Sequence, residues 1–249
     1  MSTIEEERLA KFLEKHDLHL LTDATDIVTV GTIYKKYEDL KFRRIGYIDN
    51  FVLPQVNIPE TKKGTINNIR ENLRDAKSVN FIVSGISNFI SSFGFSINTQ
   101  KEKIAETNYF EVKIEEIDNV SMGNLLKDHH LDTSNSEFDA NSEYYVVSRI
   151  VKSKDIKVNM KLSKDLKAAL EAKGGPPVTE GKITLDIASG KLDEVTYSYN
   201  GEEPLVFGVH LRCIQFDKTN GNIIKLESLT KVSKLLGDDE HYRLLELKK

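Results

Sequence analysis

Twenty-three consecutive residues of this 249-residue chain, Ser78 to Gln100, carry no charged side chain. The stretch is long enough to cross a bilayer, but it is too rich in Ser and Asn to do so as a helix. One face of such a helix would hold only Ser and Asn, whereas an exposed helix normally shows Lys and Glu to water. This polar but uncharged face indicates contact with something other than water. The apolar residues recur at helical spacing and are Ile82, Ile86, Phe89, Ile90, Phe93 and Ile97.

Two interpretations of this uncharged segment compete. In the first, it is a helix packed in a cleft of its own protein, with its hydroxyl groups bonded back to its own carbonyls. In the second, it leaves its pocket for a lipid interface as an amphipathic element. The pattern of residues leaves both open.

Composition excludes several classes of protein. Cys213 is the single cysteine, so the chain has no intramolecular disulfide and no cysteine-based zinc motif. The charged start, Met1 to Lys11, lacks the apolar core of a secretory signal, so we expect a cytoplasmic location. A net charge of −4 gives no general attraction to nucleic acid. The length suits one domain with a sizeable core.

Predicted strands outnumber predicted helices. Helices are predicted over Thr3 to His16 and from Thr65, on the spacing of Ile66, Ile69 and Leu73. The dipeptide Asn200-Gly201 predicts a hairpin turn. The order of elements is irregular, so the predicted class is α+β, a twisted, largely antiparallel sheet with peripheral helices. Period-two alternation predicts strands at Phe110, Val112 and Ile114, at Ile156, Val158, Met160 and Leu162, and at Ile183, Leu185 and Ile187.

A basic block and an apolar tail follow these strands. From Lys152 to Lys173 the chain has seven lysines against three acidic residues, a pattern typical of a solvated face and also compatible with anionic lipid head groups. The lysines considered for head groups are Lys152, Lys154, Lys157, Lys161, Lys164 and Lys167. The tail is broken at Gly237-Asp238 into pieces too short to be helical alone in water, so it needs a partner surface. Its apolar residues include Leu229, Val232, Leu235, Leu236, Tyr242, Leu244 and Leu245.

No catalytic motif is present. The chain lacks a nucleophile elbow, a Walker loop, a dinucleotide-binding glycine pattern and a zincin motif. Cys213 and His210 are three apart on a predicted strand and therefore point to opposite faces, so Cys213 is predicted to be a small buried residue. His129-His130 is predicted to be a surface pair rather than a metal site. We therefore predict no enzymatic activity, no cofactor and no metal.

The order of the sequence segments is similar to that of one family. An N-terminal helix precedes VGTIYKKYEDLKFRRIGYIDNFVLP, VSGISNFISSFGFSI, NYFEVKIEEI, SMGNLLKDHHL, YYVVSRIVKSKDIKVNM and PLVFGVHLRCIQFD, and a short amphipathic tail ends the chain. Over nearly its whole length the chain resembles a gasdermin of the compact prokaryotic type. One departure is that many prokaryotic relatives carry an acylated cysteine near the N-terminus, whereas Met1 to Lys11 has none.

The resemblance implies a pore-forming body, residues 1–226, held inactive by a C-terminal tail, residues 227–249. It implies that a caspase-like or trypsin-like protease cuts before the tail, and that the body then forms homo-oligomers on membrane lipids at the cell membrane. Two regions, Val79 to Ile117 and Tyr144 to Tyr199, would extend as β-hairpins into a large pore, causing cell death in defence against phage. The candidate cleavage residues are Asp217, Lys225, Lys231 and Lys234.

A second hypothesis is a cytosolic binding or immunity protein whose tail is permanently docked. The two hypotheses differ in whether removal of the tail makes the protein permeabilise liposomes.

Overall fold

The structure is a computed structural model that describes residues 7–8, 16–25, 27–38, 41–71, 103–161, 168, 178–180, 183–187, 194–229 and 244–248. The predicted amphipathic segment Ser78 to Gln100 lies outside these residues. So do the following predicted site residues: Leu162, Lys164, Lys167, Lys231, Val232, Lys234, Leu235, Leu236 and Tyr242.

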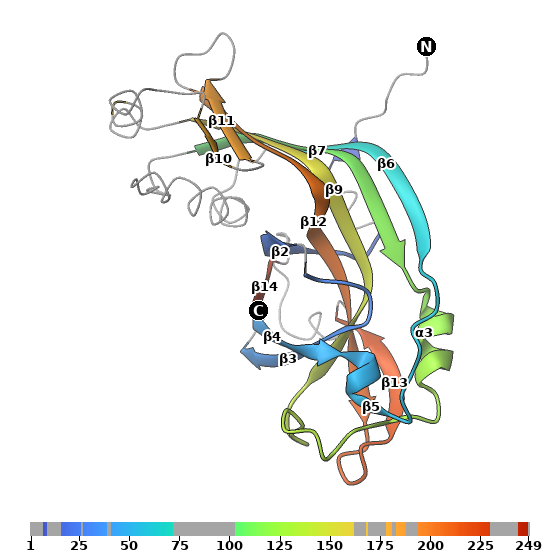
Figure 1. Cartoon of the computed structure of the whole chain (residues 1–249). Helices are drawn as coiled ribbons and strands as arrows, with labels where there is room; N and C mark the ends of the chain where they lie inside the picture. The colour runs from blue at the N-terminus through green and yellow to red at the C-terminus, as the bar shows by residue number, and fades with distance from the viewer. Residues whose placement is uncertain are drawn as a thin grey trace.

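Three long antiparallel strands form the spine of the molecule (Figure 1). They are β7 (Lys103–Glu116), β9 (Tyr144–Lys161) and β12 (Glu194–Phe216), with β9 paired between the other two. Beyond β7 lie β6 (Lys62–Glu71) and then β1 (Glu7–Arg8), while β11 (Ile183–Ile187) and β10 (Val178–Glu180) continue from the first part of β12. The alternating runs of the sequence are therefore strands of one sheet, and the predicted α+β class with a largely antiparallel sheet is confirmed.

The lower part of the sheet closes on itself. From β9 the pairing runs through β3 (Thr32–Glu38), β4 (Lys41–Tyr47), β14 (Leu244–Lys248) and β2 (His19–Thr25) to β12, which pairs with β9 again. We call this closed set of strands the ring. Strand β14 comes from the C-terminal end of the chain and lies parallel to both of its neighbours, so two segments nearly the whole length of the chain apart complete one sheet.

The remaining described elements cover the lower end of the sheet. Strand β13 (Ile223–Ser228) pairs with the end of β12, and the short strands β5 (Val52–Leu53) and β8 (His130–Leu131) pair with each other. The 3-10 helix η1 (Ile48–Asn50) precedes β5, and helix α3 (Asn119–Leu126) follows β7. The largest fully buried side chains are Tyr34, Tyr109, Tyr144, Tyr145, Phe42, Phe51, Phe207, Ile33 and Ile48.

Two predicted helices are wrong. The residues from Thr65 belong to strand β6, which pairs antiparallel with β7 from Lys62 to Glu71. Glu7–Arg8, inside the predicted helix Thr3 to His16, pairs parallel with β6. A short apolar run at helical spacing also fits a strand with one buried face. Here the residues form a strand because pairing with the edge of β7 satisfies backbone N–H and C=O groups of β6.

Two Asn-Gly dipeptides of the chain differ in backbone structure. Asn200-Gly201 is not a hairpin turn, because β12 continues through both residues. Asn220-Gly221 does join two strands, β12 and β13, and Gly221 has a φ of +76°. A Cβ at Gly221 would lie 2.8 Å from the Leu131 carbonyl oxygen, so the glycine is required both by its conformation and by space.

Candidate functional site

The three long strands extend past the ring as a bent arm. We define the arm as residues 68–71, 103–110, 155–161 and 194–200 of β6, β7, β9 and β12, together with β1, β10 and β11, and the body as the other described residues. Figure 1 shows the arm curving away from the body toward β10 and β11. Such extended antiparallel strands are the element that the predicted membrane hairpins require.

The structure divides the predicted hairpin residues between arm and body. Val112 and Ile114 of β7 lie in the body and are buried in its core, whereas Phe110 and Ile156 lie in the arm beside the junction. The remaining described positions fall on arm strands and are Val158, Met160, Ile183, Leu185 and Ile187. Insertion of these residues in a membrane stays a prediction.

The predicted head-group lysines are in different surroundings. The Lys152 side chain is only 19% exposed, and its Nζ lies 2.7 Å from Oε1 of Glu115 on the neighbouring strand. Lys157 is exposed, and its Nζ lies 5.1 Å from the centroid of the Phe110 ring. Lys154 and Lys161 are also on β9. In this conformation Lys152 is committed to an ion pair, whereas Lys157 is accessible to an anionic surface.

The described part of the tail is held by backbone pairing on both of its edges. In β14, Leu244 and Leu245 are opposite Leu20 and Leu21 of β2, while Glu246, Leu247 and Lys248 are opposite Lys41, Phe42 and Arg43 of β4. At the other end of the tail, Leu229 is 3% exposed and follows directly on β13. Strand β13 runs to Ser228, so it crosses the predicted boundary between residues 226 and 227.

Two of the candidate cleavage residues lie in the ordered β12–β13 hairpin. Oδ1 of Asp217 accepts hydrogen bonds from the backbone N–H and the hydroxyl of Thr219, at 2.8 Å and 2.6 Å, which lower the pKa of Asp217. Lys225 is on β13, with its Nζ 2.5 Å from Oε1 of Glu227. A protease that binds an extended substrate would have to open this hairpin to cut there.

A buried polar network was not predicted from the sequence. Nε2 of His210 lies 3.0 Å from Oδ2 of Asp17 and 3.2 Å from Oγ of Ser228, and its Nδ1 lies 2.7 Å from Oγ of Ser148. The Ser228 hydroxyl also donates to Oδ2 of Asp17, at 2.8 Å. The network thus joins the segment before β2, strands β9 and β12, and the last residue of β13.

This network contains a serine, a histidine and an aspartate, but its geometry does not suit a hydrolase. Ser148 is 1% exposed, so no substrate carbonyl reaches its hydroxyl. The arrangement satisfies buried polar groups instead. The sequence could not indicate this network, because Asp17 and His210 are 193 positions apart and only the fold brings them together.

Cys213 is a buried thiol, as predicted. It is 4% exposed, burial raises its pKa to about 11, and Nε2 of Gln215 lies 3.3 Å from its Sγ. His210 has other partners, so the two residues do not form a thiol–imidazole pair.

The predicted surface pair His129-His130 lies at and just before strand β8. Nδ1 of His129 lies 2.9 Å from the carbonyl oxygen of Lys127, and His130 is in β8. Across the described ranges, no three His, Cys, Asp or Glu side chains gather as metal ligands would. Within those same ranges no helix combines the length and the apolarity that a membrane span demands.

Comparisons with known proteins point to one family. The family model described as Bacterial Gasdermin Family matches residues 27–222. Among solved structures, the chain is similar to a bacterial gasdermin from Bradyrhizobium tropiciagri, with a TM-score of 0.53 and 15% sequence identity, over 95% of this chain and 94% of that chain. No curated protein sequence matches this one.

Proposed function

The chain belongs to the bacterial gasdermin family, and on this premise we propose that it forms membrane pores after a protease separates its tail from its body. The family supports a pore-forming role in general. Proteolytic activation, assembly of many copies in the cell membrane, and cell death as a defence against phage are the specific parts of the proposal. The inactive protein would be cytoplasmic, and no catalytic chemistry of its own is involved.

The observation that carries the proposal is the position of β14 between β2 and β4. While the chain is intact, β14 is tethered to β13 and its local concentration at the ring is high. A cut between Leu229 and Leu244 would turn the binding of β14 into a bimolecular event for a strand of only five residues. Such a short strand has little affinity of its own, so it would leave, and the ring would open at β2 and β4.

The arm supplies the membrane-facing part of the proposal. Its strands carry the alternating pattern that a membrane-crossing strand needs, and the exposed Lys157 is placed to meet anionic head groups. The uncharged segment Ser78 to Gln100 directly precedes β7 in the chain, so it would enter the bilayer with that strand.

The same position of β14 also favours a second candidate function. A strand paired on both edges could be a permanent part of the fold, in which case the protein would be a cytosolic binding or immunity protein. The two candidates differ in the fate of the tail after cleavage.

Dye release from anionic liposomes separates them. The test protein is the full chain with a site for a sequence-specific protease in place of residues 237–241, which lie between β13 and β14 and include none of the apolar tail residues, so that the body folds before the cut. We expect no leakage before cleavage and rapid leakage after it, as well as leakage from a chain that ends at Leu229. A cleaved protein that stays folded and releases no dye would favour the second candidate. In the cleaved form, Ile86→Asp or Phe89→Asp should abolish leakage.

A further inference from the structure

The pairing of the three long strands is interrupted on both sides of β9 at one level of the sheet, and single-residue register shifts also occur between Ile104 and Glu106, Val206 and Gly208, and His210 and Leu211. On β9 this level is Ser153–Lys154. Toward β7, one ladder ends at the pair Phe110 and Asp155, and the next begins at Lys113 and Lys152. Toward β12, the register changes between the pair Asn200 and Asp155 and the pair Leu205 and Ser153.

The change on β12 is a bulge of three extra residues. Between the two pairs β12 has four residues, 201–204, where β9 has only Lys154. The bulge contains a glycine and a proline, Gly201 and Pro204, which suits backbone that makes no ladder bonds. The hairpin turn predicted at Asn200-Gly201 is therefore wrong, and the dipeptide lies where the bulge begins.

The interruption on β7 has its own local conformation. Glu111 has a φ of +48°, in the left-handed region that a non-glycine residue seldom adopts. The Ser153 hydroxyl lies 2.6 Å from the carbonyl oxygen of Phe110 and 2.8 Å from that of Asp155, and can donate to either. A side chain thus takes the place of ladder bonds between the strands.

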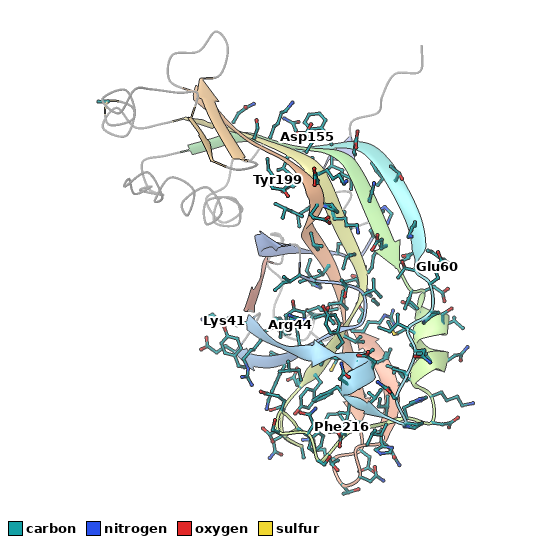
Figure 2. The ribbon with its side chains drawn as sticks, viewed as in Figure 1. Lys41, Arg44, Glu60, Asp155, Tyr199 and Phe216 are labelled. Atoms are coloured by element: carbon teal, nitrogen blue, oxygen red, sulfur yellow. The ribbon has the colours of Figure 1, made fainter. Side chains whose placement is uncertain are left out.

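Side-chain contacts also cross this level, because Tyr109, Ile156 and Tyr199 of the arm belong to the buried core. The Tyr199 hydroxyl donates to the carbonyl oxygen of Glu203, at 2.7 Å, and the buried ring of Tyr109 stacks on that of Phe207 with centroids 4.0 Å apart. Among the described residues, no donor reaches the buried Oδ1 of Asp155. Figure 2 shows Asp155 and Tyr199 where the long strands curve out of the body.

We propose that the residues 111–112, 153–154 and 201–204 form a hinge line, at which the arm turns relative to the body when the protein enters a membrane. Hinges are short segments whose backbone takes up a large change in φ and ψ, and bulges are where a sheet bends most easily. The aligned interruptions allow the arm to turn as one unit while the ladders on either side keep their pairs. The inference rests on the proposed pore-forming function and adds the place where the molecule bends.

Distances between pairs of spin labels test the hinge directly. The chain with the protease site also carries Cys213→Ser, and labels are placed at V120C and K157C, one in the body and one in the arm. The matched control is V120C with I224C, because both residues are in the body and are 71% and 67% exposed. On vesicles of phosphatidylethanolamine and phosphatidylglycerol, cleavage should shift the whole arm-to-body distance distribution and leave the control distribution unchanged.

A deletion variant tests whether the bulge permits the motion. Removing Glu202, Glu203 and Pro204 cancels the register shift between Asn200 and Leu205 against β9, so the cleaved variant should bind the vesicles but release dye at least about tenfold more slowly. Dye release at the normal rate by this variant would overturn the hinge. An unchanged arm-to-body distance in a protein that leaks would also overturn the hinge, and it would leave the pore-forming function intact. This distance measurement does not depend on the folding of the deletion variant. Absence of leakage from the cleaved parent protein would overturn both.

Discussion

A polar network around the buried His210 fixes how the start and the end of the body meet. Asp17 lies just before β2 and Ser228 ends β13, and His210 of β12 contacts both. A buried hydrogen bond contributes modestly when made, but a buried polar group left without its partner is costly. The network therefore specifies one arrangement of these segments more strongly than apolar contacts would.

Replacing His210 by alanine should lower the free energy of unfolding by about 1–3 kcal/mol, because the buried Ser148 hydroxyl loses its partner, while the Asp17 carboxylate, 44% exposed, stays hydrated. Urea denaturation of the full chain measures the change. The matched control is His129→Ala, at a histidine whose ring contacts a single exposed carbonyl, and it should stay within about 0.5 kcal/mol of the parent. Equal loss in both variants would show that the network does not stabilise the fold.

At the scale of elements, local patterns predicted strands well and their connections poorly. The alternating runs of β7, β9 and β11 follow directly from residue order. Strand β6 was mistaken for a helix because its type is decided by pairing with β7, a contact absent from a single-sequence pattern. The ring was not predictable at all, since β14 joins β2 over more than 200 residues. The polar network could not be predicted from the sequence for the same reason.

Helix α3 has an aspartate as its N-cap. Asp118 holds that position, and its carboxylate accepts from the backbone N–H of Ser121, at 2.9 Å, and pairs with Nζ of Lys62, at 2.7 Å. Aspartate and serine are both preferred N-caps, and the residue with β-region backbone geometry takes the role.

The stability that Asp118 contributes should depend on pH. Its contacts with Lys62, and then with Ser121, hold the pKa of Asp118 below the usual value of an aspartate side chain. A carboxyl group with a lowered pKa in the folded state stabilises the fold above the pKa of the unfolded chain, and this contribution is lost as the pH falls through the folded value. Asp118→Asn should thus be less stable than the parent at neutral pH, and the difference should shrink below about pH 4.

The measurement is urea denaturation at a series of pH values in low salt, because salt screens an exposed pair. Asp128→Asn, beyond the other end of α3, serves as the control. Asn tolerates the positive φ of Asp128, so this substitution removes one carboxylate beside α3 without straining the backbone. A difference at Asp118 that is the same at every pH would contradict the assignment.

At the scale of the whole molecule, one strand at the chain end determines whether the ring is closed. Without β14, the facing edges of β2 and β4 would each have unpaired N–H and C=O groups, and open edges of this kind bind other strands. The intact chain thus covers its own edges. In the proposed function, this is why an uncut molecule stays apart from its copies and a cut one does not.

If β14 restrains the molecule by its pairing rather than by the integrity of the chain, weakening that pairing should mimic the cut. Leu245→Pro removes a backbone donor inside β14, and Lys249→Pro makes the same change just after it. Loss of one such bond is worth about 1–3 kcal/mol, so the fraction of open rings should rise about 5–150-fold. The uncut Leu245→Pro protein should therefore release liposome dye, whereas the uncut Lys249→Pro protein should be as silent as the parent. Silence from uncut Leu245→Pro, in a protein that leaks once it is cut, would place the restraint in the tail between Leu229 and Leu244.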